Sequence, residues 1–172
     1  MFSSWGLTWR GWLDNRRGEW WLLAQLLLIA AHLLPARPTP DSWGIAPWPR
    51  PLVWLGALMV LWGLGLALQA FITLGSNLSP LPEPKDSHQL IQEGPYQQRR
   101  HPMYQAVLVC SAGMVIAQGS LLHLLLLLAL GLVLGGKARR EERALLLLHP
   151  TYAMYQRTTA AIIPGLPWLD WR

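Results

Sequence analysis

The sequence predicts an all-α integral membrane protein with about four short transmembrane helices, and two observations carry this prediction. Of its 172 residues, 52% are hydrophobic and only 13% are charged, whereas charged residues make up about a quarter of a typical soluble domain. The apolar residues also gather into runs that approach or exceed the length needed to cross a bilayer core of roughly 30 Å. We expect a single membrane domain over 1–172, with two spans in 1–74 and the remaining helices in 75–172.

Two apolar runs predict the first two spans. Trp20 to Leu34 contains fifteen residues, which reach about 22 Å as a helix, so a full crossing needs flanking residues or a thinner bilayer. Residues 36–50 are rich in proline and tryptophan, a composition typical of a connection at the membrane interface. Pro51 to Leu74 is uncharged over twenty-four residues and begins with a proline suited to the first turn of a helix.

The C-terminal half predicts a polar loop followed by a helical hairpin. Residues 75–100 carry four prolines among charged and amide residues, so this segment must lie outside the hydrocarbon core. Residues 103–136 contain no Asp, Glu, Lys or Arg and would measure about 51 Å as one helix. Two helices of about seventeen residues must therefore share this stretch, and Gln118-Gly119-Ser120 is the best place for the turn.

The hairpin is expected to end at Gly135-Gly136, where a charged run from Lys137 to Arg143 begins. The following residues, Ala144 to Arg157, predict an interfacial helix that is interrupted or bent at Pro150.

Lysine and arginine divide unequally between the two sides of this arrangement. Twelve lie on the side that holds both termini, the 75–100 loop and the charged run, whereas only Arg37 and Arg50 lie on the other. Because cytoplasmic segments carry the excess of Lys and Arg, we expect the termini and the loop to face the cytoplasm, as in a bacterial-type inner membrane. The net charge of +5 favours an anionic lipid surface over nucleic acid as partner, because the basic residues flank apolar runs.

The composition excludes several kinds of site. Cys110 is the only cysteine, so an internal disulfide and paired-cysteine zinc or redox sites are ruled out, and a packing role is expected for it. The five histidines show no metal-ligand spacing, and we predict no metal site. His123 lies deep in an apolar run, where it either has a function or bonds a neighbouring helix as a neutral imidazole.

The predicted topology brings three polar clusters to one membrane face. They are Leu90 to Tyr96, Arg99 to Tyr104, and Lys137 to Glu142. The hairpin returns the third cluster to the side of the second, so residues about forty apart in sequence can meet around one ligand between helices.

The order of these clusters resembles the isoprenylcysteine carboxyl methyltransferase and phospholipid methyltransferase family of membrane enzymes. The resemblance covers about residues 75–166, and implies a compact helical bundle in which the cytosolic loop and the C-terminal interfacial helix form a pocket for S-adenosylmethionine. A lipid-side entrance would admit the substrate, and 75–172 would be the methyltransferase core. The shared pattern is, in order, Gly94-Pro95-Tyr96, Arg100-His101-Pro102-Met103-Tyr104, an apolar hairpin, Glu141-Glu142, Tyr152 and Tyr155, and Ile163-Pro164-Gly165.

The resemblance also implies roles for individual residues. The ammonium and sulfonium of S-adenosylmethionine favour carboxylate and aromatic neighbours, and its carboxylate favours donors. The implied cofactor-binding residues are His88, Leu90, Ile91, Tyr96, His101, Pro102, Met103, Tyr104, Glu141 and Glu142. The implied catalytic residues are Lys137, Arg100 and Glu141.

Lys137 is a departure from the family pattern. It stands one helical turn before Glu141 and so on the same helix face, where the family places a basic group for the carboxylate of the substrate. The family prefers arginine at this position. A lysine supplies the same positive charge but cannot donate two parallel hydrogen bonds to a carboxylate.

The resemblance implies methyl transfer from S-adenosylmethionine to an amphiphilic, lipid-like or prenylated molecule, most like carboxyl O-methylation of an isoprenylcysteine. The sulfonium is an activated donor, so no protein nucleophile is needed. A carboxylate acceptor is already ionised at neutral pH, whereas an ammonium acceptor must first lose a proton. The lack of an obvious base therefore favours a carboxylate.

Other functions stay open at this point. One is N-methylation of a phospholipid amine, and another is a non-enzymatic membrane subunit that keeps the same hairpin. A nicotinamide-dependent reductase of similar helical design ranks last, because the sequence lacks a Rossmann glycine fingerprint. The sequence does not predict the oligomeric state.

Overall fold

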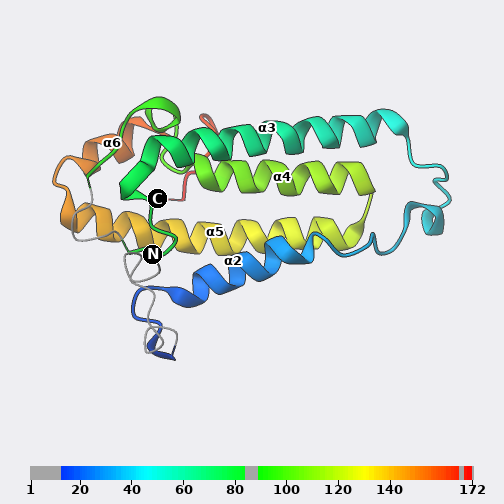
Figure 1. Ribbon diagram of the computed structural model, residues 1–172, viewed down its shortest axis with the longest axis horizontal. Helices are drawn as coiled ribbons and strands as arrows, with labels where there is room; N and C mark the ends of the chain where they lie inside the picture. Colours follow the sequence, from blue (N-terminus) through cyan, green and yellow to red (C-terminus); the bar gives the residue numbers. More distant parts are fainter. Residues whose placement is uncertain (1–12, 84–88, 167–168, 172) are drawn as a thin grey trace.

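The structure is a computed structural model that describes residues 13–83, 89–166 and 169–171. All regular structure within these ranges is helical, which confirms the predicted fold class, and four apolar helices form the bundle (Figure 1). The α-helices are α2 (Glu19–Ala31), α3 (Arg50–Leu74), α4 (Pro102–Gln118), α5 (Leu121–Leu148) and the short α6 (Tyr152–Thr158), and the 3₁₀ turns are η2 (Pro40–Trp43), η3 (Gly75–Asn77) and η4 (Gly94–Gln97).

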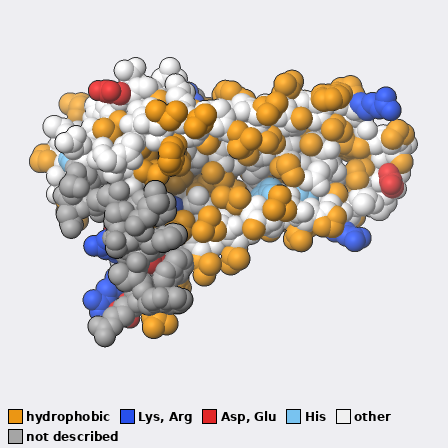
Figure 2. Space-filling view, viewed as in Figure 1, with side chains coloured by type: hydrophobic (Ala, Val, Ile, Leu, Met, Phe, Trp, Pro, Cys, Tyr) orange, Lys and Arg blue, Asp and Glu red, His pale blue; other side chains and the backbone are white. Residues whose placement is uncertain are grey.

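Two of the helices, α3 and α5, are long and apolar enough to cross a membrane. Only 22% and 33% of their most apolar windows are buried inside the protein, and large side chains such as Trp54, Leu58 and Leu132 are exposed. Figure 2 shows hydrophobic side chains along the length of the bundle, with charged side chains gathered toward its two ends. A helix that is apolar on its exposed sides as well as its packed side suits lipid as its surroundings.

The predicted hairpin is present, and its turn lies at Gly119 and Ser120. Gly119 has a φ of 56°, a left-handed conformation that favours glycine, and a Cβ here would lie 2.6 Å from the ring of Trp48. The indole of Trp48 also donates to the carbonyl of Ile116 at 3.0 Å, which satisfies a carbonyl left unpaired at the end of α4. The tryptophan-rich connection thus closes over the turn.

The second helix of the hairpin is longer than the sequence predicted. α5 continues through Gly135-Gly136 and the charged run to Leu148, so residues from Ala144 onward extend the hairpin helix and do not begin a separate one. The interruption expected at Pro150 is confirmed, because the next helix, α6, begins at Tyr152. The glycines do not end the helix, because each one makes room for an indole. Trp171 lies 3.2 Å from a Cβ built on Gly135, and a Cβ on Gly136 would overlap the ring of Trp21.

Small residues bring α3 and α4 into close contact. A Cβ on Gly56 would overlap the carbonyl of Gly113, and one on Gly63 would lie 2.5 Å from the sulfur of Cys110. Contacts of this kind are how membrane helices gain packing energy without a hydrophobic driving force between them. Cys110 has the packing role expected of it, with its sulfur 3.6 Å from the carbonyl of Val60.

A buried polar layer joins α2 to α4 and α5. The ring of His32 bonds the hydroxyl of Ser111 through Nε2 and the carbonyl of Leu28 through Nδ1, at 2.5 and 2.8 Å. His123 is fully buried, and its Nε2 lies 3.2 Å from the carbonyl oxygen of His32 and 2.9 Å from the amide nitrogen of Gln118. Of the two interpretations of His123, this contact matches the one in which it bonds a neighbouring segment.

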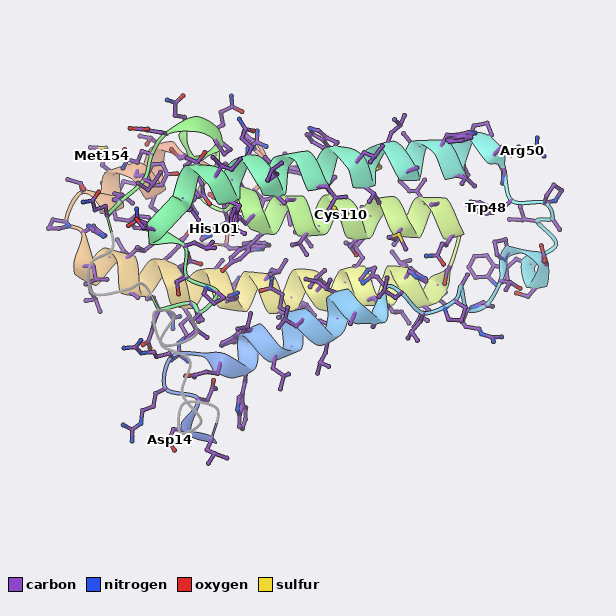
Figure 3. All side chains as sticks on the ribbon, in the orientation of Figure 1. Asp14, Trp48, Arg50, His101, Cys110 and Met154 are labelled. Carbon is purple, nitrogen blue, oxygen red and sulfur yellow. The ribbon has the colours of Figure 1, made fainter. Side chains whose placement is uncertain are left out.

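The polar loop and the hairpin ends meet at one end of the bundle. Figures 1 and 3 place α6 with Met154, His101 and the first described residues, including Asp14, at this end, whereas Trp48 and Arg50 lie at the other. The end that holds His101 is called the site end below.

Candidate active site

The Arg-His-Pro segment is held by the chain that follows α6. The N–H of Arg100 donates to the carbonyl of Ala160 at 2.9 Å, and the N–H of His101 donates to the carbonyl of Ala161 at 3.0 Å. Pro102 then opens α4, where a proline fits because the first-turn N–H has no partner within the helix. These bonds fix the direction in which Arg100 and His101 leave the backbone.

Arg100 is buried, and its guanidinium reaches five acceptors. Its Nε donates to Glu142 at 2.7 Å, and its Nη1 lies 3.1 Å from a carboxylate oxygen of Asp170. Further N–H groups donate to the carbonyls of Gln156 (3.0 Å), Thr159 and Asp170 (2.8 Å). The planar guanidinium has enough N–H donors to bond all of these acceptors. These bonds connect the start of α4 to α5, to α6 and to the last described residues.

His101 lies beside the same ion pair. Its Nε2 is 2.8 Å from Glu142, whose other oxygen accepts a hydrogen bond from the amide of Gln156 at 2.7 Å. Since Glu142 is a carboxylate paired with Arg100, the imidazole Nε2 of His101 donates to it. The ring is stacked on Tyr104, with centroids 5.1 Å apart and planes 5° from parallel.

Glu141 presents the accessible carboxylate of the site. One of its oxygens accepts a hydrogen bond from the hydroxyl of Tyr104 at 2.7 Å and lies 3.9 Å from Nδ1 of His101, which is too long for a hydrogen bond. The side chain is 30% exposed, compared with 3% for Glu142. The two neighbouring acids therefore differ in position, with Glu142 engaged by the protein and Glu141 open to a ligand.

A narrow cavity of about 80 Å³ connects these groups. All four tyrosines of the chain line it, together with apolar side chains and the groups described above. Its lining comes from α3, the connection after it, η4, α4, α5 and α6. The lining residues are Leu74, Ser79, Leu90, Ile91, Tyr96, Arg100, His101, Met103, Tyr104, Glu141, Leu145, Tyr152 and Tyr155.

The tyrosines outside the spans are neutral hydrogen-bonding groups. Burial raises the pKa of Tyr155 to about 12, with Arg100 opposing and Glu142 adding to the shift. The pKa of Tyr96 is raised further, first by burial and then by the charge of Glu141. The hydroxyl of Tyr155 donates to the carbonyl of Tyr96 and lies 3.4 Å from the carbonyl oxygen of Arg99. These contacts hold α6 against the Gly-Pro-Tyr turn.

One comparison with known proteins decides the family. A family model described as phospholipid methyltransferase matches residues 51–149, which is more than half of the chain and includes α3, the Arg-His-Pro segment and both acids. The chain belongs to the phospholipid methyltransferase family. This confirms the resemblance to the isoprenylcysteine and phospholipid methyltransferase group, and membership implies methyl transfer to a lipid-like substrate. No curated protein matches the sequence.

The predicted site residues of this methyltransferase fall into three groups. Pro102 is buried at the start of α4, while Glu142 and Lys137 contact residues of the cavity wall without lining the cavity. His88 lies outside the described residues. The residues that the structure brings together around the cavity are Leu90, Ile91, Tyr96, Arg100, His101, Met103, Tyr104 and Glu141.

Lys137 is buried between α5 and α2. It stands one turn before Glu141, as the sequence predicts, and its ammonium donates to the side-chain oxygen of Gln25 at 2.7 Å. The same ammonium lies 5.3 Å from the centroid of the Tyr104 ring, within the range of a cation–π contact. The Lys137 ammonium thus lies between Gln25 of α2 and the ring of Tyr104. It contacts the cavity only indirectly, because Tyr104 lines the cavity.

Sequence reasoning missed several residues of this candidate site. Tyr152 and Tyr155 belong to the family pattern but received no ligand role, although their spacing of three residues places both on one helix face. Gln156 and Asp170, which hold Glu142 and Arg100, carry no recognisable pattern in the sequence. Only the fold brings them to the site.

Proposed function

We propose that the protein is a membrane methyltransferase that uses S-adenosylmethionine, the usual donor of its family, and that the cavity at the site end is its cofactor site. The observation that carries the proposal is the convergence of Glu141, His101 and four tyrosines on one cavity at the end of the bundle. His101 and Glu141 are forty residues apart and meet only through the hairpin.

The lining fits the chemistry of this cofactor. The Glu141 carboxylate and the tyrosine rings suit the ammonium and sulfonium groups, because cations favour carboxylates and aromatic faces. Leu90, Ile91 and Leu145 offer an apolar wall for a heterocycle. The bound cofactor would supply an electrophilic methyl group, so the residues of this chain need only bind, orient and exclude water.

The cavity must widen for the cofactor to enter. Its volume of about 80 Å³ is below the roughly 300 Å³ at the lower end of small-molecule sites. Ser79, Leu90 and Ile91 belong to no helix, so this part of the wall can move outward without the loss of helical hydrogen bonds. We expect Glu142 and Arg100 to stay in place, since both are held by several partners.

The acceptor proposed first is the carboxylate of an isoprenylcysteine-type amphiphile. Such an acceptor is ionised at neutral pH and needs no proton transfer. The hydrophobic surface of the bundle gives a prenyl chain access from the bilayer, and the positive-inside bias supports a site on the cytoplasmic face of a bacterial-type inner membrane.

A second acceptor, a phospholipid amine, is favoured by one specific observation. Lys137 and Arg100, the cations expected to bind a carboxylate, are both engaged by groups of the protein. Nδ1 of His101 and the carboxylate of Glu141 lie next to the cavity, and either could take the proton that an ammonium acceptor must lose.

Radiolabelled cofactor distinguishes these possibilities. Detergent-solubilised protein is incubated with labelled S-adenosylmethionine and prenylcysteine or aminophospholipid acceptors, and the product is treated with alkali. A methyl ester releases its label as methanol, whereas an N-methyl group keeps it, so the outcome assigns the acceptor class. Transfer to none of these acceptors, together with no cofactor binding at millimolar concentration, would refute the proposal.

Replacement of Glu141 tests the cofactor site. Because a hydrogen bond to a charged group contributes about 1.5–3 kcal/mol, Glu141→Gln should weaken S-adenosylmethionine binding about 10- to 100-fold in calorimetry. Glu93→Gln is the matched control, since Glu93 is exposed and does not line the cavity. Equal affinities of the two variants would exclude Glu141 from the binding site.

A further inference from the structure

A second cavity, of about 350 Å³, lies between α3 and the segment that precedes α4. It shares no lining residue with the active-site cavity, and its volume is within the range of small-molecule sites. The lining residues are Trp62, Gly65, Leu66, Gln69, Gly94, Pro95, Gln98 and Arg99.

This second cavity is polar at one end and apolar at the other. Gln69, Gln98 and Arg99 lie toward the site end, whereas Trp62 is about 10 Å farther along α3, near the middle of the helix. Trp62 is 58% exposed, and a Cβ on Gly65 would meet nothing within 4 Å. The apolar half is therefore an open groove on the lipid-facing surface of α3.

Arg99 carries a positive charge that no carboxylate among the described residues neutralises. Its Nη1 and Nη2 donate to the side-chain amide oxygens of Gln105 and Gln98, the latter at 2.8 Å, and its buried Nε has no hydrogen-bond partner. No carboxylate of the described residues lies within ion-pair distance of it. The adjacent Arg100 differs, because its charge is met by Glu142 and Asp170.

We propose that this groove binds an anionic membrane phospholipid, with phosphate oxygens against the Arg99 guanidinium and an acyl chain along Gly65 and Trp62. The order of polar and apolar groups along α3 matches the order of head group and chain in a bilayer leaflet. The planar guanidinium matches a phosphate, and a charge-assisted hydrogen bond is roughly twice as strong as a neutral one.

The bound lipid would also restrict the movement of the turn that carries Tyr96, which lines the active-site cavity. Arg99 is joined through the backbone to Arg100, and its carbonyl lies 3.4 Å from the hydroxyl of Tyr155. A lipid held by Arg99 therefore fastens the turn that carries Tyr96 to the end of α3. The lipid site does not depend on the proposed methyl transfer, so its test uses binding and stability rather than activity.

The test titrates the purified protein, in an uncharged detergent, with dioleoylphosphatidylglycerol or with dioleoylphosphatidylcholine, which has the same chains and no net charge. Native mass spectrometry measures binding and thermal unfolding measures stabilisation. We expect the wild-type protein to prefer the anionic lipid about tenfold or more, and Arg99→Gln to lose that preference. Arg99→Lys should keep part of it, because the charge remains.

Two controls separate this site from general surface charge. Arg157→Gln removes an exposed arginine of α6 outside both cavities and should leave the preference unchanged. Gly65→Leu fills the apolar groove and should weaken binding of both lipids, whereas Gly131→Leu, also at a glycine with open surroundings, should not. An equal loss in Arg99→Gln and Arg157→Gln, or equal stabilisation by inorganic phosphate alone, would overturn the proposal.

Discussion

The ion pair between Arg100 and Glu142 shows how one buried residue can organise a site. Both side chains are almost fully buried, with exposed fractions of 0% and 3%. A charge taken out of water is tolerated only when it is paired and hydrogen-bonded. Arg100 satisfies this requirement with partners on α5, α6 and the segment near Asp170, so its position defines where the C-terminal residues lie.

Removal of Glu142 should therefore destabilise the protein strongly. Glu142→Leu leaves Arg100 charged and without its main partner, and the loss of one member of a buried pair costs about 3–5 kcal/mol. Thermal unfolding in detergent should show a clearly lower midpoint than for the control Glu93→Leu, whose side chain is exposed. A midpoint equal to that of the control would mean that the ion pair does not hold the fold together.

The raised pKa of the buried tyrosines predicts that the folded protein loses stability at alkaline pH. The pKa of Tyr155 is raised to about 12 by burial, whereas an unfolded tyrosine titrates near 10. A group with a raised pKa stabilises the fold fully below pH 10, and this contribution falls as the pH rises through 12.

Ultraviolet absorbance of tyrosinate measures this effect. The folded protein should show little tyrosinate at pH 10 to 11 from Tyr96, Tyr152 and Tyr155, because burial raises the pKa of each. The protein unfolded in denaturant should titrate near pH 10. Normal titration of these three groups in the folded protein would contradict the buried hydrogen bond from Tyr155 to Tyr96.

The sequence allowed residues around the cavity to be predicted, but not the contacts that hold these residues in place. Tyr96, His101 and Glu141 were predicted because they belong to short ordered clusters, and the structure gathers them around one cavity. The pairing of Arg100 with Glu142 across α4 and α5 depends on helix rotation, which spacing alone does not give. Lys137 was predicted to bind a ligand, but in the structure its ammonium donates to Gln25. This contact depends on how α2 packs against α5, which the sequence pattern does not give.

At the scale of helices, the two adjacent glycines of α5 have separate packing roles. Gly136 admits the ring of Trp21, whereas Gly135 lies against Trp171. We predicted the end of the hairpin here because the charged run from Lys137 ends the apolar stretch, and glycine also lowers helix propensity by about 1 kcal/mol. Tertiary packing outweighs this preference, and the helix continues. The turn at Gln118-Gly119-Ser120 was predictable because length and turn residues agreed.

Gly136→Leu should displace α2. A leucine side chain cannot share space with Trp21, and the overpacking costs typically 1–3 kcal/mol. Gly131→Leu is the matched control on the same helix, since a Cβ there meets nothing within 4 Å, and it should be neutral or slightly stabilising. Thermal unfolding and protease cleavage near α2 report the difference. Equal midpoints for the two variants would show that α2 does not depend on this contact.

At the scale of the molecule, the arrangement predicts a sidedness. Gln92 lies just before η4 and Asp41 lies in η2, and both are exposed. These two segments lie at opposite ends of the bundle (Figure 1). In a background that carries Cys110→Ala, a single cysteine introduced by Asp41→Cys should react with a membrane-impermeant maleimide added to intact cells. The Gln92→Cys variant should react only after the membrane is permeabilised, because the positive-inside bias places this end in the cytoplasm. Labelling in the reverse order would invert the proposed topology.

The segment that fastens Arg100 and His101 has a consequence for biosynthesis. Ala160, Ala161 and Asp170 lie after the long apolar helices in the sequence, so the ribosome delivers them after those helices. Until they emerge, the backbone at Arg100 and His101 lacks the hydrogen bonds to Ala160 and Ala161 that hold it, and contacts such as those with Glu142 and Tyr104 orient these side chains. The site would therefore be completed only after its helices have entered the lipid.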